Sequence, residues 1–334
     1  MSNPVRIGVL GTGRIGGMHA LLIAERVEDA VVAAVHDEVP ELARAVAARL
    51  GVPAAGSAEE LYASADLDAV AICSSTDSHV EAMIAAAAAG KAIFCEKPLS
   101  LDLADLDRGL AAVERAGVLF QVGFNRRFDP AHRSVRDAVA DGTVGDVHVV
   151  RITSRDPEPP PAEYVRRSGG LFLDMTIHDF DMARYVTGSE VVEVFARAAT
   201  RIGADPDVLD TAVVTLTHAD GAFTVIDNSR QALYGYDQRV EAFGSLGVAA
   251  SGNPLAHTGV VRTADGTHAP TLPYFFLERY VPSYVRAWEA FALAFREGQP
   301  SLVGVRDGRA PLVIGLAAGL SQREGRPVRV DEIG

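Results

Sequence analysis

Apolar runs alternate with helix-like stretches over the first third of the chain. Val5–Leu10 and Ala30–Val35 are short apolar runs with the composition of buried strands, and Met18–Val27 between them has the apolar spacing of a helix. Further strand-like runs lie at Ala69–Cys73, Ala92–Cys95 and Leu119–Val122, and helix-like stretches at Pro40–Leu50, Glu59–Ala63, Ser78–Ala89 and Leu103–Ala116. This pattern predicts an α/β domain with a parallel, doubly wound sheet over residues 1–122.

The pattern changes after residue 122. Strand-like runs now follow one another at Val147–Ser154, Val191–Ala199, Thr211–Leu216, Phe223–Asn228, Gln238–Phe243 and Gly247–Ala250. Consecutive strands predict a mostly antiparallel, open sheet, and a helical stretch at Gly169–Tyr185 makes residues 123–334 an α+β domain. Val281–Phe295 is expected to be an amphipathic helix with Trp288 in the core. We expect the last apolar helix, Ala310–Leu320, to return to the first domain.

The composition is that of an ordinary globular protein. The 334 residues are 48% hydrophobic and 22% charged, with a formal net charge of −13. Because nucleic acids and anionic membranes attract basic surfaces, this charge argues against both as partners. No apolar run has the length of a transmembrane helix, and no signal-peptide pattern precedes Val5. Cys73 and Cys95 both end buried strands, which is typical of core thiols in a reducing compartment, so a cytoplasmic location is expected.

A glycine-rich loop joins the first predicted strand to the first predicted helix. Residues 11–16, GTGRIG, have the G-x-G-x-x-G spacing. In this context Gly11 makes the tight turn, Gly13 lets a pyrophosphate approach the backbone, and Gly16 permits close helix–strand packing. The loop therefore predicts a Rossmann dinucleotide-binding domain, with Arg14 and Ile15 as further cofactor contacts. A glycine-rich turn of any α/β protein is the alternative while the motif is considered alone.

An acidic residue follows the second predicted strand. Asp37 lies about twenty residues after the last glycine of the loop, the separation typical of dinucleotide-binding domains. A carboxylate there accepts hydrogen bonds from the adenosine ribose and repels a 2′-phosphate, so Asp37 favours NAD over NADP. Arg14, inside the loop, is the residue that would weaken this preference.

Polar residues also follow the third and fourth strands, where ligands bind in parallel sheets. Ser74, Thr76 and His79 come after the third strand, and Glu96 and Lys97 after the fourth, which makes all five candidates for the cofactor cleft. Lys97 is distinctive because the proline that follows it restricts its backbone to extended geometry. A lysine fixed there can polarise a substrate hydroxyl. A Glu–Lys pair on a surface loop is the alternative.

The stretch Gly169–Tyr185 predicts a helix with one polar stripe. Residues three and four apart share a helical face, so Asp174, His178, Asp181 and Tyr185 align, with apolar residues on both sides. A carboxylate one turn from an imidazole orients a general base and stabilises its protonated form. For an isolated D-x-x-x-H, however, a pair on a helix surface is the more common explanation.

Together these motifs resemble the glucose–fructose oxidoreductase, inositol dehydrogenase and rhizopine-catabolism (GFO/IDH/MocA) family. The resemblance rests on the glycine loop, on Glu96-Lys97-Pro98 and on the DMTIHD sequence at residues 174–179, in that order, and it covers nearly the whole chain. It implies NAD-dependent oxidation of a ring secondary alcohol to a ketone. His178 would take the hydroxyl proton, Asp174 would orient it, and Lys97 would hold the reacting oxygen. No metal is implied.

Within the family, the chain is most similar to inositol 2-dehydrogenases. The similarity lies in GFNRRFD at residues 123–129, TSRDP at 153–157 and YGYDQRVE at 234–241. It implies myo-inositol as the substrate and the 2-keto inosose as the product. The candidates for polyol contact are Arg127 and Tyr236, with Asp156 and Asp179 behind them. For each of these four residues, a structural hydrogen bond is the alternative role.

Two alternatives remain open for the activity. The substrate could be another inositol isomer, a sugar or another polyol, or the chain could be a non-catalytic NAD-binding sensor. The presence of Lys97, Asp174 and His178 together favours the enzyme, because a binding module needs no such set. The family uses the open sheet face for assembly, so the resemblance also implies a homotetramer.

Overall fold

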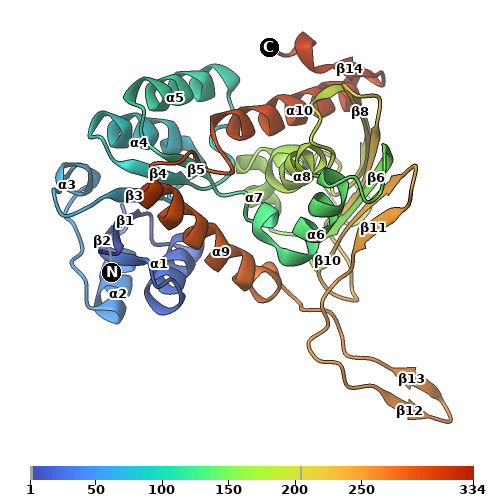
Figure 1. Cartoon of the computed structure of the whole chain (residues 1–334), viewed down its shortest axis with the longest axis horizontal. Coiled ribbons are helices and arrows are strands. Elements are labelled where there is room, and N and C mark those ends of the chain that lie inside the picture. Colours follow the sequence, from blue (N-terminus) through green and yellow to red (C-terminus); the bar gives the residue numbers. More distant parts are fainter. Residues whose placement is uncertain (1–2, 204) are drawn as a thin grey trace. The chain divides into compact units, whose positions relative to one another are not determined.

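The computed structural model describes residues 3–203 and 205–334, and the chain folds into two compact units (Figure 1). The first runs to Asn125 and includes Ser283–Leu312, and the second comprises Arg126–Pro282 and Val313–Gly334. The chain first passes from one unit to the other after Asn125, close to the predicted boundary at residue 122. Met1 and Ser2, part of the N-terminal segment in which no signal-peptide pattern was found, lie outside the described residues.

A parallel five-stranded sheet, in the order β2-β1-β3-β4-β5, forms the first unit. Its strands are β1 (Val5–Leu10), β2 (Ala30–His36), β3 (Ala69–Ile72), β4 (Ala92–Cys95) and β5 (Phe120–Val122). The helices between them are α1 (Arg14–Arg26), α2 (Pro40–Leu50), α3 (Ala58–Ala63), α4 (Thr76–Ala88) and α5 (Leu103–Ala116). Every residue of β3 and β4 is buried, as expected where helices cover both faces of a parallel sheet. The predicted doubly wound sheet is confirmed.

Trp288 completes the core of the first unit. It lies on α9 (Phe276–Glu297), which from Ser283 onward belongs to this unit, and its ring stacks on Phe94 of β4 with centroids 4.3 Å apart. Trp288 is fully buried, so its predicted core position is confirmed. The predicted domain limits placed this helix in the second domain. Its periodicity shows that one face is apolar but does not indicate which core takes that face.

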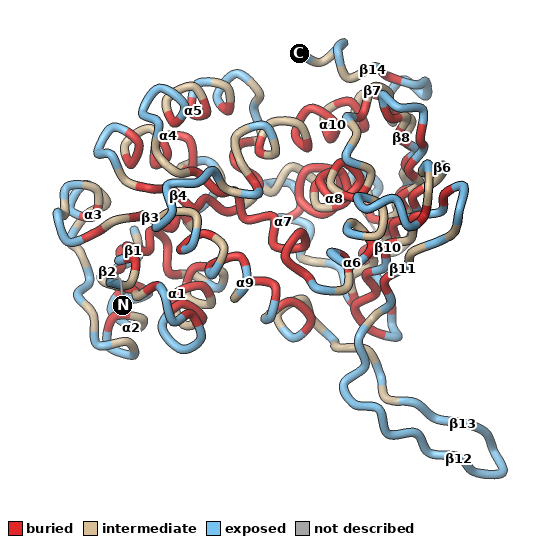
Figure 2. Tube along the Cα trace, in the orientation of Figure 1, coloured by how far each residue is buried: buried red, intermediate tan, exposed pale blue. Residues whose placement is uncertain are grey.

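The second unit contains a seven-stranded sheet in the order β11-β10-β6-β9-β8-β7-β14. The strands are β6 (Val147–Arg155), β7 (Val191–Ala199), β8 (Thr211–His218), β9 (Phe223–Ser229), β10 (Asp237–Gly244), β11 (Val248–Ser251) and β14 (Val328–Arg329). Only β6 and β9 run parallel, so the predicted mostly antiparallel sheet is confirmed. A separate hairpin, β12 (Val261–Thr263) and β13 (Gly266–His268), is exposed along both strands (Figure 2).

The second unit also contains helices, several of which share a hydrophobic core with this sheet. They are η1 (Asn125–Phe128), α6 (Pro130–Ala140), α7 (Ala162–Arg167), the π-helix η2 (Leu171–Thr176), α8 (Ile177–Thr187), the second part of α10 (Val305–Glu324) and η3 (Val330–Glu332). Ile314 and Ala317 of α10 lie in the core of the second unit, which differs from the expectation that Ala310–Leu320 returns to the first domain. In the described part of the chain, no helix has both the length and the hydropathy to cross a membrane.

Candidate active site

The glycine loop of the first unit depends on close backbone approaches. Gly11 has a φ of +85°, and a Cβ there would lie 2.5 Å from the backbone nitrogen of Ser74. At Gly16 a Cβ would lie 1.8 Å from the carbonyl oxygen of Gly11, so α1 can pack on the loop only without a side chain. At Gly13, which caps α1, no described atom lies within 4 Å of such a Cβ. This open space beside a helix N-terminus fits a pyrophosphate.

Asp37, directly after β2, lies against the same loop. One carboxylate oxygen accepts hydrogen bonds from the backbone N–H of Thr12 at 2.6 Å and from its hydroxyl at 3.2 Å. The other oxygen accepts from the N–H of Val39 at 2.9 Å. These donors fix the carboxylate beside the glycine loop, where a dinucleotide-binding domain places its ribose acceptor. Of the two other predicted contacts in the loop, Arg14 is exposed and Ile15 is half-buried.

His79 links the loops that follow β3 and β4. The side chain is buried on α4, with Nε2 3.0 Å from the carbonyl oxygen of Ser74 and Nδ1 2.9 Å from that of Pro98. Burial lowers the pKa of His79, so the neutral ring has one N–H to donate to these two acceptors. Ser74 also pairs with Ser78 through their hydroxyls at 2.7 Å, and Thr76 begins α4. Of the predicted contacts after β3, His79 therefore joins Ser74 to the loop that carries Lys97.

A chain of hydrogen bonds through buried side chains holds the backbone of Lys97. Trp288 donates from Nε1 to Nδ1 of His19 at 2.9 Å. Since an indole can only donate, the remaining imidazole nitrogen carries the proton and donates to Glu96 Oε1 at 2.8 Å. The second oxygen of Glu96 accepts from the backbone N–H of Lys97 at 3.1 Å. Glu96, predicted as a cofactor contact, thus holds the backbone of the half-buried Lys97, whose peptide bond to Pro98 is cis.

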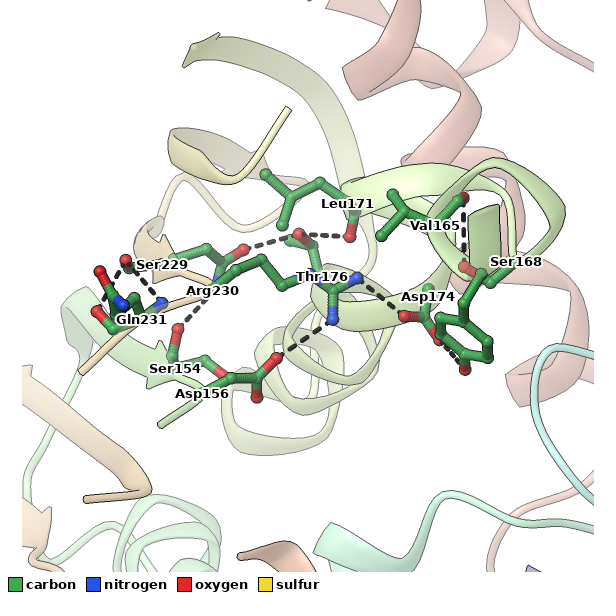
Figure 3. Close-up of polar contacts among 12 residues, drawn as sticks. Ser154, Asp156, Val165, Ser168, Leu171, Asp174, Thr176, Ser229, Arg230 and Gln231 are labelled. Atoms are coloured by element: carbon green, nitrogen blue, oxygen red, sulfur yellow. Dashed lines mark hydrogen bonds and ion pairs between the residues drawn. The ribbon is translucent and has the colours of Figure 1, made fainter. Parts of the chain in front are cut away.

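In the second unit, Asp174 occupies the π-helix η2. Gly170, with a φ of +77°, starts this segment, and the side chain of Asp174 is buried. Its Oδ2 accepts from Nη2 of Arg230 at 2.7 Å, and its Oδ1 accepts from the hydroxyl of Tyr164 at 3.2 Å (Figure 3). His178 follows at the start of α8 and is half-buried. Asp174 and His178 are thus on adjoining turns, although the predicted single α-helix begins as a π-helix.

Asp156 and Asp174 are brought together by one guanidinium. Asp156 directly follows β6, and its Oδ2 accepts from Nη1 of Arg230 at 3.1 Å (Figure 3). Burial raises the pKa of Asp156; the charge of Asp174 adds to this rise, and Arg230 opposes it. Two predicted site residues therefore share a partner that the sequence analysis did not single out.

Asp179 and Arg127 lie in buried ion pairs. Asp179 accepts from Nη1 of Arg126 at 2.7 Å and from the side-chain amide of Asn228 at 2.8 Å. Burial raises the pKa of Asp179, and Arg126 opposes this rise. Arg127 donates to both oxygens of Asp181, at 2.6 Å for the shortest contact. Their hydrogen-bonding capacity is therefore largely used within the second unit.

Tyr236 lies directly before β10 and is buried edge-to-face against Tyr280, with ring centroids 6.0 Å apart. Burial raises the pKa of its hydroxyl, which keeps it a neutral hydrogen-bond donor. No group of three or more His, Cys, Asp or Glu side chains in the described residues is arranged to hold a metal ion.

Arg230, Asn228 and Tyr164 are site neighbours that sequence reasoning missed. A signal was available for two of them, because the even-numbered residues of β9 are buried and the alternation continues through Asn228 to Arg230. Tyr164 follows the proline-rich segment at residues 159–161, where periodicity gives no orientation.

Comparison with known proteins matches the chain to one family. Residues 5–124 match the model described as oxidoreductase family, NAD-binding Rossmann fold, and residues 132–250 match the GFO/IDH/MocA C-terminal domain. The chain is 48% identical to the myo-inositol 2-dehydrogenase of Thermotoga maritima, over 98% of this chain and 99% of that one. It is 44% identical to the inositol 2-dehydrogenase of Rhizobium meliloti, over 98% and 99% of the two chains.

A solved structure of the same size has a similar fold. It is the scyllo-inositol dehydrogenase of Lactobacillus casei with bound NAD(H) and scyllo-inositol, 30% identical, with a TM-score of 0.92 over 98% of this chain and 100% of that one. The match of the first unit to an NAD-binding domain agrees with the cofactor predicted from the glycine loop and Asp37.

Proposed function

We infer the activity of this chain from the family to which it belongs, the NAD-binding GFO/IDH/MocA oxidoreductases. We propose that it oxidises the 2-hydroxyl of myo-inositol to the 2-keto inosose. The observation that carries the proposal is the 48% identity to a myo-inositol 2-dehydrogenase across almost the full length of both chains. The presence of Lys97, Asp174 and His178 in the matched domains supports a catalytic role over a sensor role.

The residues of the first unit fit NAD. Gly13 leaves room for a pyrophosphate, and Asp37 is fixed beside the loop by Thr12. When bound, NAD supplies the acceptor for the hydride that leaves the alcohol carbon. We propose that Ser74, Thr76 and His79 shape the cleft for this cofactor, and that Glu96 acts by holding the Lys97 backbone.

We propose that His178 is the general base of the reaction. Its imidazole would take the hydroxyl proton as the carbon–oxygen bond becomes a carbonyl. Asp174, buried and one turn earlier, would orient the imidazole and stabilise its protonated form. Lys97 would donate a hydrogen bond to the reacting oxygen, which lowers the energy of the developing alkoxide.

We propose different roles for the four polyol candidates. Tyr236 would donate to a ring hydroxyl, with Asp156 accepting from a hydroxyl close to it. Arg127 is buried and already donates to both oxygens of Asp181, so its part would be to hold that carboxylate. Asp179 is fully buried, and both its oxygens already accept hydrogen bonds, so its part would be to hold Arg126 in place. We further propose a homotetramer, as the family resemblance implies. We propose a cytoplasmic location because Cys73 and Cys95 have the character of core thiols in a reducing compartment.

The proposal is tested by NADH absorbance with the purified full chain. The panel comprises myo-, scyllo- and chiro-inositol, glucose and galactose, each with NAD and with NADP. We expect the highest kcat/KM for myo-inositol with NAD. A higher value for scyllo-inositol would move the substrate to that isomer, which the likeness to a scyllo-inositol dehydrogenase makes the second candidate. NAD binding without turnover of any cyclic polyol would refute the proposed activity and favour a sensor.

A further inference from the structure

Strand β9 fixes the helix that bears the proposed base. Its inward-facing Asn228 accepts from the hydroxyl of Thr176 at 2.6 Å and donates to Asp179 at 2.8 Å. The next inward position is Arg230, which binds Asp174 at 2.7 Å. Three polar residues of the DMTIHD sequence are therefore tied to Asn228 of β9 and to Arg230, directly after this strand. This attachment limits how far η2 and α8 can move relative to the sheet.

The guanidinium of the buried Arg230 binds two acids. Arg127 pairs with Asp181, and Arg126 pairs with Asp179, whereas the two terminal nitrogens of Arg230 divide between Asp156 and Asp174 (Figure 3). One cation between two carboxylates leaves a formal net negative charge, with Arg230 and Asp174 buried and Asp156 half-buried. Such a cluster depends on the geometry of the guanidinium, because Asp174 left alone would be an uncompensated buried charge.

The guanidinium is suited to this task by its shape. Its planar fork presents donors in fixed directions, so it sets the distance between the two carboxylates as well as neutralising them. Tyr164 holds the second oxygen of Asp174 at 3.2 Å, which leaves the carboxylate with little rotational freedom. The backbone N–H of Arg230 donates to the carbonyl oxygen of Asp210 at 2.8 Å, so the base of the side chain is fixed as well.

We propose that Arg230 is a positioning residue for the oxidation, one that holds Asp174 for its work on His178 and Asp156 for its contact with the polyol. This inference rests on the proposed function. If it holds, removing the guanidinium of Arg230 lowers kcat because Asp174 is no longer positioned. It also raises the polyol KM because Asp156 is no longer positioned. NAD binding should stay unchanged, since the cofactor residues belong to the first unit.

The first test compares Arg230→Lys with a matched control. Lysine keeps the positive charge but lacks the planar, forked guanidinium that binds both carboxylates in fixed directions. We therefore expect kcat to fall about 10- to 100-fold, the loss expected when a group at the reaction centre is displaced by roughly 1 Å. The polyol KM should rise, and the Kd for NADH measured by fluorescence should stay within about twofold of wild type. Arg184 is a similarly buried arginine, paired with Glu190 at 2.7 Å, and Arg184→Lys should leave kcat and KM near wild type.

The second test is the pH profile of kcat/KM, because a merely structural residue would not move it. The titratable and charged groups of the second unit that act on the two carboxylates include Tyr164, Arg126, Tyr236 and Arg230 itself. Arg230→Gln removes a positive charge, so the pKa governing the acidic limb should rise and the limb should move to higher pH. Asp156→Asn removes a negative charge, so the limb should move to lower pH.

These outcomes separate the inference from the proposed function. If the wild-type chain turns over no cyclic polyol, the proposed function fails. If the wild type is active but Arg230→Lys retains its kcat, KM and acidic limb, the inference is overturned. Thermal unfolding shows whether each variant is folded. If neither Arg230 variant folds, the Asp156→Asn variant still tests the inference. An acidic limb of its kcat/KM profile at the wild-type position would contradict the electrostatic link between Asp156, Arg230 and Asp174.

Discussion

His178 carries the most specific expectation at the scale of single residues. If its imidazole is the general base, His178→Ala should lower kcat by roughly two to four orders of magnitude. The Kd for NADH, read by fluorescence, should be unchanged. His148, exposed on β6 of the same unit, provides the control, and His148→Ala should keep full turnover. An effect of His178→Ala confined to polyol KM would make His178 a binding residue.

His132 gives a pH-dependent stability that is separate from catalysis. It is buried, with Nδ1 2.9 Å from the Ser251 hydroxyl oxygen, and burial lowers the pKa of its imidazole to about 3. Because this pKa lies below the unfolded value of about 6.5, the stabilisation is fully present above pH 6.5 and is lost as pH falls towards 3. This one group steepens the pH dependence of the unfolding free energy by up to about 1.4 kcal/mol per pH unit.

Denaturant unfolding between about pH 4 and pH 6, within the window below the unfolded histidine pKa of about 6.5, measures this slope. The His132→Gln variant keeps polar atoms for Ser251 and Tyr280 but cannot titrate, so its unfolding free energy should depend less on pH than that of wild type. His148→Gln, at an exposed position, should behave as wild type. Equal slopes for wild type and His132→Gln would contradict the assignment.

The loop between β1 and α1 supplies a prediction at the scale of elements. A Cβ at Gly16 would overlap the carbonyl oxygen of Gly11, so Gly16→Ala should destabilise the protein even without cofactor. A Cβ at Gly13 meets no described atom, so Gly13→Ala should leave the unfolding free energy within about 1 kcal/mol of wild type. It should nevertheless weaken NAD binding, because the methyl group takes the space of the pyrophosphate.

Calorimetric titration with NAD and thermal unfolding distinguish the two glycines. We expect Gly13→Ala to lose NAD affinity at unchanged stability, and Gly16→Ala to lose stability. If a stable Gly13→Ala variant bound NAD with wild-type affinity, the pyrophosphate could not lie beside Gly13.

Elements with a strong period were predictable from the sequence, and their local distortions were not. The alternation of strands and helices in residues 5–122 predicted the parallel sheet because its strands are apolar, and β3, β4 and β5 are buried throughout. The helix around Asp174 was expected as a single α-helix, yet it begins as the π-helix η2. Its start depends on tertiary partners, among them Asn228 on β9 and Arg230 directly after this strand, and these contacts leave no trace in the helical period. The polar stripe therefore predicted the neighbourhood of Asp174 and His178 but not what holds Asp174.

At the scale of the whole molecule, the order of the elements along the chain does not tell which of the two units each belongs to. Apolar periodicity identified α9 and α10 as core helices, but the residues from Ser283 to Leu312 belong to the first unit and those from Val313 to the second. An amphipathic pattern has no information on which of two cores it faces. The candidate site shows the same limit, because carboxylate positions could be read from motifs, whereas the arginines that neutralise them lie far away in sequence.

The most direct test of the central claim uses myo-inositol that carries deuterium at C2. The wild-type chain is incubated with this substrate and NAD, and the NADH formed is analysed by mass spectrometry. Oxidation of the 2-hydroxyl predicts NADH that contains the deuterium. Unlabelled NADH would show that another ring carbon is oxidised, and the absence of NADH would contradict the proposed activity altogether.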